Sequence, residues 1–232
     1  MEGLKSNPDK INIAVVDDHN LFREGIVALL KDYQDLEVVV QAEDGKQFVK
    51  WLDTVKKSGG NLPHIVLLDI QMPEMNGIET TIYLQQFYPD IKIIILTMHN
   101  EEELIFDLMN KGASGFLAKD KSVDMVVDAI YSIMENGIYF NEQILHSIVQ
   151  SWQKTHDIDK LMAELRISPR EHEIIQLLAE QKTTKEIAAT LTISTRTVDI
   201  HRKSIFVKTG TINTAGLVFF AIKNNLLKIS KS

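Results

Sequence analysis

The first 140 residues alternate short apolar runs with longer amphipathic stretches. The apolar runs are rich in Val, Ile and Leu, which is typical of buried strands. The predicted strands cover residues 11–17, 37–42, 64–69, 92–97 and 115–118, and the predicted helices cover 20–32, 45–57, 77–87, 101–110 and 123–136. Because strand and helix alternate in this order, the pattern predicts an α/β domain, with a parallel sheet covered by helices on both faces.

The pattern becomes entirely helical from Ser168 onward. Ser168 begins a run of Ser-Pro-Arg-Glu, which combines a Ser N-cap, Pro at the first helical position and Glu three residues after the cap. The predicted helices cover residues 169–180, 184–191, 195–208 and 213–225. No strand pattern occurs in this part of the sequence, so it predicts an all-α domain of four helices.

Residues 141–166 differ from both neighbours. Ile144, Ile148 and Trp152 recur at helical spacing, which indicates a linker containing one amphipathic helix. The predicted parts are a disordered N-terminus at 1–9, an α/β domain at 10–140, this linker at 141–166 and a helical domain at 167–232.

Composition excludes several classes of protein. The chain has 232 residues and no cysteine, so it forms neither disulfides nor cysteine-ligated zinc sites. The polar stretch from Met1 to Lys10 lacks the apolar core of a signal peptide, and no apolar run approaches the roughly 20 residues that span a bilayer. We therefore expect a cytoplasmic protein without a membrane partner.

Charge divides the chain in the same way. Residues 1–140 carry 12 basic and 23 acidic residues, a net charge of −11, whereas residues 141–232 carry 13 and 9, a net charge of +4. Two domains of opposite charge imply different partners. The basic part is the one suited to approach nucleic acid.

Chemically active side chains gather at the ends of the predicted strands. Asp17 and Asp18 follow the first strand, Asp69 ends the third, Thr97 ends the fourth and Lys119 follows the fifth. In open parallel sheets the ligand site lies beyond these carboxyl ends. Three neighbouring carboxylates repel one another unless a cation binds, and Mg²⁺ prefers such oxygen ligands.

This set of groups fits phosphoryl transfer to an aspartate. In that reaction a carboxylate such as Asp69 attacks in line, while Mg²⁺ and the ammonium of Lys119 neutralise the phosphoryl oxygens. A Mg²⁺ phosphatase of the haloacid dehalogenase type uses similar groups but requires a second Asp two residues after the nucleophile. Position 71 is Gln, and that class leaves the helical domain unexplained.

Residues 10–138 resemble the receiver domain of two-component response regulators. The matching residues are Asp17-Asp18, Asp69 with Met72-Pro73, Thr97, Gly112-Ala113 and Lys119. The resemblance implies a doubly wound five-stranded sheet of order 2-1-3-4-5. One departure is Asp120, which follows Lys119 where many receivers have Pro and a cis bond, so the geometry of that bond stays open.

The same resemblance implies roles for individual residues. Asp69 is expected to accept the phosphoryl group. Mg²⁺ is expected to be bound directly by Asp18, Asp69 and the backbone carbonyl of Gln71, and through water by Asp17. Lys119 is expected to assist catalysis, and Thr97 and Phe116 to form a switch pair in which the hydroxyl moves to the phosphoryl group and the ring rotates inward.

Two of the predicted C-terminal helices indicate a helix-turn-helix. Small Ala residues in 184–191 allow a second helix, 195–208, to cross closely after a short turn. The alternative is a helical bundle with a solvated, charged face. Residues 168–227 resemble the LuxR-type DNA-binding domain of the NarL/FixJ class through Ser168-Pro169-Arg170-Glu171, Lys185-Glu186-Ile187-Ala188, Ile193-Ser194, Thr197-Val198 and His201.

The resemblance implies that helix 195–208 enters the major groove of DNA. The expected base contacts are Arg196, Asp199, Ile200 and Lys203, and the expected phosphate contacts are Lys185, Thr195, Thr197, Arg202 and Lys208. Helix 213–225 is expected to supply a dimer contact through Leu217 or Phe220. Asp199 stands where the family often has Lys; it cannot bind phosphate, but it can accept a hydrogen bond from cytosine.

These expectations combine into one function. A partner histidine kinase phosphorylates Asp69, and phosphorylation favours a homodimer that binds double-stranded DNA and regulates transcription. The protein is not an enzyme beyond Mg²⁺-dependent self-phosphorylation and slow self-dephosphorylation. The alternative is a regulator that binds DNA without phosphorylation and uses its first domain only as a dimer scaffold.

Overall fold

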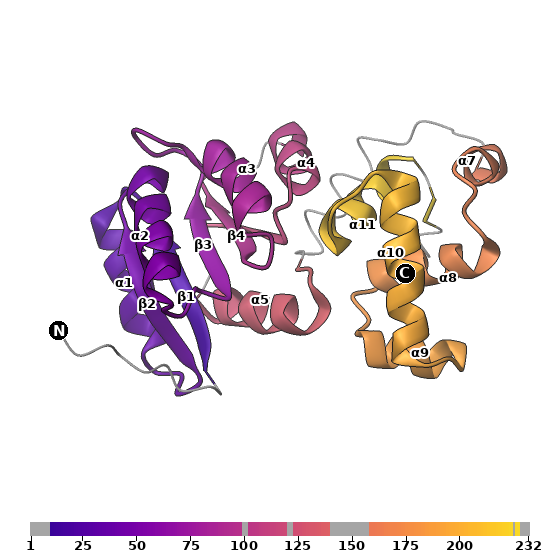
Figure 1. Cartoon of the computed structure of the whole chain (residues 1–232), viewed down its shortest axis with the longest axis horizontal. Helices are drawn as coiled ribbons and strands as arrows, with labels where there is room; N and C mark the ends of the chain where they lie inside the picture. Colours follow the sequence, from indigo (N-terminus) through magenta and orange to yellow (C-terminus); the bar gives the residue numbers. More distant parts are fainter. Residues whose placement is uncertain (1–9, 99–101, 120–122, 140–157, 225, 228–232) are drawn as a thin grey trace. The chain divides into compact units, whose positions relative to one another are not determined.

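The computed structural model describes residues 10–98, 102–119, 123–139, 158–224 and 226–227, and Figure 1 shows the elements that they form. Three predictions fall outside the described residues. They concern the N-terminus at 1–9, the helix expected around Ile144 to Trp152, and the bond from Lys119 to Asp120, of which only Lys119 is described.

The N-terminal half contains a five-stranded sheet. Its strands are β1 (Ile11–Val16), β2 (Leu36–Ala42), β3 (Ile65–Asp69), β4 (Lys92–Thr97) and β5 (Gly115–Ala118). They lie in the order β2-β1-β3-β4-β5, and β1 pairs in parallel with both β2 and β3. The predicted fold class and strand order are confirmed.

The central strands form the core of this half. Every residue from Ile13 to Val16 and from Ile65 to Leu68 is fully buried. A strand buried on both faces requires continuous apolar residues rather than alternation, which is why these segments have unbroken aliphatic sequences. The sheet thereby holds the carboxyl ends of β1 and β3 in a fixed position.

The helices of this half are α1 (Asn20–Leu30), α2 (Gly45–Ser58), α3 (Gly77–Phe87), α4 (Glu102–Asn110) and α5 (Val123–Asn136). Right-handed crossovers in this strand order place α1 on one face and α2 and α3 on the other. In agreement, α2 contacts α3.

Side-chain caps define the starts of two of these helices. Asp44 accepts a hydrogen bond from the backbone of Gln47 at the start of α2, and Asn76 forms a reciprocal capping box with Glu79 at the start of α3. Such caps satisfy N–H groups that have no partner inside the helix.

Gly77 brings the start of α3 against the end of β3. A Cβ atom at this position would lie 2.2 Å from the carbonyl oxygen of Asp69, and the Gly77 N–H donates to the carbonyl of Ile70 at 2.9 Å. Only glycine permits this approach. The short loop that leaves Asp69 is therefore held at both ends.

The described part of the C-terminal half is helical. Its helices are α7 (Ile158–Glu164), α8 (Pro169–Ala179), α9 (Thr184–Leu191), α10 (Thr195–Thr209) and α11 (Thr214–Lys223). The capping box predicted at Ser168 and Glu171 is present, and Thr183 and Glu186 form a second one at α9. Helix α7 lies in the segment assigned to the linker and was not predicted.

The packing of α8, α9 and α10 forms a small core in this half. Ile174, Ile187, Val198 and Ile205 are fully buried. Val198 and Ile205, seven residues apart, form the inward face of α10. Within the described residues, no single helix is long and apolar enough to cross a membrane; α10 and α11 reach that length and composition only as a pair bent by 54°.

Candidate functional site

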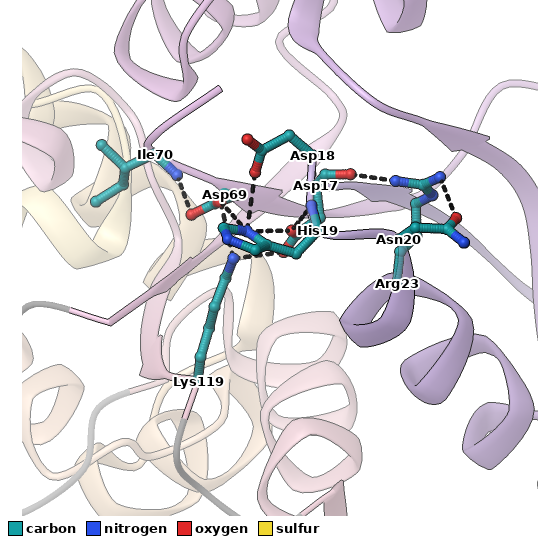
Figure 2. A network of polar contacts seen from close by, with 8 residues as sticks. All are labelled: Asp17, Asp18, His19, Asn20, Arg23, Asp69, Ile70 and Lys119. Atoms are coloured by element: carbon teal, nitrogen blue, oxygen red, sulfur yellow. Dashed lines mark hydrogen bonds and ion pairs between the residues drawn. The ribbon is translucent and has the colours of Figure 1, made fainter. Parts of the chain in front are cut away.

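Three carboxylates meet at the carboxyl edge of the sheet, as Figure 2 shows. Asp17 and Asp18 leave the end of β1, and Asp69 ends β3, which is the neighbouring strand. Together with His19 these residues place one potential ligand atom each within 4.8 Å of one another. The predicted acidic cluster therefore exists in the folded chain.

Lys119 supplies the positive charge in the cluster. Its ammonium nitrogen lies 2.7 Å from Asp17 Oδ2 and 2.8 Å from Asp69 Oδ2. The side chain is 4% exposed and passes over the ring of Phe22, at 4.9 Å from the centroid. The backbone N–H of Lys119 donates to the carbonyl of Thr97 at 2.8 Å, so the ends of β4 and β5 hold this cation against the two acids.

His19 belongs to the cluster, although it was not among the residues predicted from the sequence. Its Nδ1 atom lies 2.9 Å from Asp18 Oδ1 and 4.0 Å from Asp69 Oδ2. The sequence feature that could have identified His19 is its position directly after Asp17 and Asp18. The side chain is largely exposed, so it lies at the solvent side of the cluster.

Burial raises the pKa of the Asp69 carboxyl above its ordinary value, while the hydrogen bond and charge of Lys119 act in the opposite direction. The nearby charge of Asp17 raises it further, and the backbone N–H of Ile70, which donates to Asp69 Oδ1 at 2.7 Å, lowers it. The ammonium of Lys119 therefore does not fully compensate the desolvation of the Asp69 carboxylate. A divalent cation would complete that compensation.

The donor set suits a hard divalent cation. Carboxylate oxygens from Asp17, Asp18 and Asp69 converge there, and Mg²⁺ is bound in proteins by one or two carboxylates together with waters. The acidic cluster thus fits Mg²⁺ binding.

The remaining predicted residues of this site are placed as follows. Thr97, the last residue of β4, is 2% exposed, and Phe116, the second residue of β5, is 1% exposed, so the ring of Phe116 is already buried in this structure. Gln71 is exposed in the loop that follows Asp69 and lies two positions after it in the sequence.

Helix α10 presents a mixed polar surface in the C-terminal half. The four residues predicted to contact bases are all exposed: Arg196, Asp199, Ile200 and Lys203. Lys185 and Thr195 are also exposed, whereas Thr197 is half-buried and its backbone N–H donates to the Ser194 N-cap.

Two residues expected to hold DNA phosphates have partners within the domain. Arg202 donates to Thr184 Oγ1 at 3.0 Å and to Thr214 Oγ1 at 2.6 Å, and burial lowers its pKa. Lys208 donates to both carboxylate oxygens of Glu171 at 2.7 and 2.6 Å. These groups join α10 to its neighbouring helices, and a phosphate contact would compete with those bonds.

Glu171 is a buried carboxylate that accepts hydrogen bonds from Ser168, Ser204 and Lys208. Burial alone raises its pKa, but hydrogen bonds from Lys208, the Ser168 backbone and the Ser204 hydroxyl overcome that effect and hold the pKa at about 2. The residue therefore combines the cap of α8 with an ion pair to α10. Sequence indicated the first role but not the second.

The residues expected at a dimer contact differ in exposure. Leu217 is fully buried in α11, whereas Phe220 is half-buried. A contact with a second copy through Leu217 would require that side chain to be uncovered first.

Comparison with known families matches both halves of the chain. Residues 13–131 match the model of the response regulator receiver domain, and residues 166–221 match the model of bacterial regulatory proteins of the luxR family. The first match alone spans half of the chain. The first match lies inside the predicted α/β domain at 10–140, and the second begins at residue 166, one position before the predicted helical domain at 167–232.

Individual relatives match almost end to end. The transcriptional regulatory protein DegU of Brevibacillus brevis is 31% identical over 96% of this chain and 98% of its own length. The response regulator UvrY of Escherichia coli K12 is 33% identical over 93% of this chain and 95% of its own length.

Solved structures show the same likeness. A LuxR-family two-component response regulator from Aurantimonas sp. is 28% identical, covers 61% of this chain and 97% of its own, and has a TM-score of 0.54. The RcsB response regulator of Salmonella typhimurium, solved in work on its conformational dynamism for DNA interaction, is 25% identical over 90% of this chain and 97% of its own, with a TM-score of 0.54.

Proposed function

Since this chain belongs to the two-component response regulators that regulate transcription through a LuxR-type DNA-binding domain, we propose that Asp69 is the residue at which it is switched. A partner histidine kinase is the phosphoryl donor, and double-stranded DNA is the target of the C-terminal domain. Both partners imply a cytoplasmic location. The observation that carries this proposal is the single ammonium of Lys119, held within 2.8 Å of both Asp17 and Asp69.

The transfer is a displacement at phosphorus. An Asp69 carboxylate oxygen attacks the phosphorus of the donor phosphohistidine, the new P–O bond forms as the P–N bond breaks, and the electron pair of that bond stays on the donor imidazole. Lys119 stabilises the charge on the phosphoryl oxygens from a fixed position. Hydrolysis of the acyl phosphate later regenerates the carboxylate, and this slow self-dephosphorylation resets the switch.

Mg²⁺ would be held directly by Asp18, Asp69 and the carbonyl of Gln71, and through water by Asp17, and would supply further charge neutralisation at the phosphoryl oxygens. Asp69 must be ionised both to attack and to bind the cation. Because burial and Asp17 disfavour that ionised state, the chain's own Lys119 has the task of keeping the carboxylate charged.

The phosphoryl group then acts on one residue of β4 and one of β5. A dianionic group at Asp69 draws the hydroxyl of Thr97 toward itself, and the packing around Phe116 changes with it. Converting a mostly inactive population into a mostly active one requires about 5.5 kcal/mol of differential stabilisation. Hydrogen bonds to the phosphoryl oxygens from Thr97 and Lys119 are a source of that energy.

The active form binds DNA as a homodimer. Helix α10 enters the major groove, where Arg196, Asp199, Ile200 and Lys203 are exposed to reach base edges. A second copy reads an equivalent half-site about 34 Å away. Phe220 and, once uncovered, Leu217 supply the dimer contact.

Labelling with acetyl phosphate tests the assignment of Asp69. We expect the parent protein to incorporate phosphate in the presence of Mg²⁺, because the carboxylate, the ammonium and the acidic pair are already assembled. Asp69→Asn should incorporate none, since the amide is not a nucleophile. Mass spectrometry measures the mass gain of about one phosphoryl group.

Asp90→Asn is a matched control, because Asp90 is an exposed aspartate in the same half of the chain. It should label like the parent. Equal labelling of Asp69→Asn and the parent would show that another residue is the acceptor.

A further inference from the structure

Arg23 is a buried cation for which the phosphoryl transfer described above has no role. Its side chain is 7% exposed, and it shares the inward face of α1 with Ile26 and Leu30. Arginine is almost never fully buried unless it is paired, and desolvation of a charge costs free energy that an ion pair often does not recover. An aliphatic residue would pack on this face without that cost.

The guanidinium reaches three acceptors. Nη1 donates a hydrogen bond to the main-chain carbonyl oxygen of Asp17. Nη2 donates to Asn20 Oδ1 at 2.7 Å and lies 3.7 Å from a carboxylate oxygen of Glu43. Figure 2 shows Arg23 approaching the acidic turn from the side away from Lys119. The two cations therefore contact the same turn at different atoms: Lys119 binds a carboxylate, and Arg23 binds the backbone.

The first turn of α1 begins directly after the acidic pair. The backbone N–H of Arg23 donates to the carbonyl oxygen of His19 at 3.0 Å, which is the i→i−4 bond of an α-helix, so the contact that is specific to this side chain is the one from its guanidinium to Asp17. His19 stands at the N-cap of α1 but makes no side-chain cap; its backbone N–H donates instead to Asp17 Oδ1 at 2.9 Å. By holding the Asp17 carbonyl, the guanidinium fixes the peptide between Asp17 and Asp18, from which both carboxylate side chains leave the backbone.

We propose that Arg23 is a positioning residue that preorganises the carboxylates of Asp17 and Asp18 for Mg²⁺. This inference rests on the proposed function, because it takes the acidic cluster to be the Mg²⁺ site. Lysine at position 23 would retain the charge, but a single ammonium lacks the planar fork that reaches the carbonyl and Asn20 together. Groups that orient metal ligands typically change metal affinity by about 10- to 100-fold when they are replaced.

Isothermal titration calorimetry of the full-length chain with MgCl₂ tests this role. We expect Arg23→Lys to weaken Mg²⁺ binding by about 10- to 100-fold relative to the parent. In acetyl-phosphate labelling, the Mg²⁺ concentration that gives half the maximal rate should rise by a similar factor, while the rate at saturating Mg²⁺ stays close to that of the parent. A general packing defect would lower the maximal rate instead of separating the two quantities.

Arg170→Lys is the matched control. Arg170 also donates to a backbone carbonyl, that of Leu191, and pairs with Glu173, but it belongs to the DNA-binding domain. The same chemical change there should leave Mg²⁺ affinity unaltered. Parent-like Mg²⁺ affinity in Arg23→Lys would overturn the inference.

A second variant keeps the test decisive if Arg23→Lys does not fold, as judged by circular dichroism. Asn20→Ala leaves the guanidinium in place and removes only one of its acceptors, so it should weaken Mg²⁺ binding measurably but less. Unchanged affinity in this variant would contradict the inference. Failure of the proposed function has a different signature, because the parent itself would then neither bind Mg²⁺ nor label at Asp69.

Discussion

At the scale of single residues, two lysines of the same helix differ in role because they have different partners. Lys203 is exposed on α10, whereas Lys208, on the same helix, is bound by both oxygens of Glu171. Sequence predicted a DNA contact for both. Because phosphate binding by Lys208 would leave a buried carboxylate without its cation, we now expect Lys203 to make the larger electrostatic contribution to DNA binding.

The salt dependence of DNA affinity measures this difference. Lys203→Ala should reduce the slope of log K against log salt by about 0.9, because one fewer counterion is released when the complex forms. Lys203→Arg is the control and should retain the parent slope. Fluorescence anisotropy with labelled duplex at several salt concentrations provides the slopes, and an unchanged slope in Lys203→Ala would remove it from the DNA contacts.

At the scale of elements, one carboxylate joins the start of α8 to the end of α10. Glu171 completes the capping box of α8 with Ser168 and receives the ammonium of Lys208 from α10. Its side chain is 4% exposed, so solvent does not compete for these bonds. The relative placement of the helix-turn-helix and α8 therefore depends on the ionised form of this residue.

Acid should weaken the ion pair between Glu171 and Lys208 as the pH falls from about 4.5 toward 2. The folded-state pKa of about 2 lies below the ordinary value of 4.5, so the ionised form contributes stability that is fully present above about pH 4.5 and is lost as the pH falls toward 2. Glu171→Gln should destabilise the domain by about 1–3 kcal/mol at pH 7, and its deficit relative to the parent should shrink at pH 3.

Amide hydrogen exchange of α8 and α10 in urea, followed by mass spectrometry, reports the stability of this domain within the full chain. Glu173→Gln is the control, since Glu173 is half-exposed and pairs with Arg170 at the surface. A deficit in Glu171→Gln that is equal at both pH values would contradict the role given to the carboxylate charge.

The spacing of hydrophobic residues predicted the bounds of the helices and strands closely, because apolar runs and helix caps are local features of the sequence. The range of α3, 77–87, and those of β4 and β5 agree with the structure residue for residue. Contacts between distant residues were not predictable in this way: Lys208 and Glu171 are 37 positions apart. Arg23 did carry a local signal, since it occupies the helical position that continues the apolar face of Ile26 and Leu30.

At the scale of the whole molecule, the chain separates an acidic regulatory part from a basic DNA-binding part. Residues 1–140 carry a net charge of −11 and residues 141–232 a net charge of +4. Only the second part attracts the phosphate backbone of DNA. A chemical event in the acidic part must therefore change the DNA affinity of the basic part through a coupling free energy, which in proteins is typically about 1–3 kcal/mol.

The affinity of the full-length chain for one DNA duplex, with and without beryllofluoride and Mg²⁺, tests that coupling most directly. The duplex would be selected from a random-sequence pool with the beryllofluoride-loaded protein. We predict that loading raises the affinity of the parent by about 5- to 150-fold and leaves that of Asp69→Asn unchanged. Equal affinities of the parent in the two conditions would contradict phosphorylation control and would instead identify a regulator that binds DNA without it.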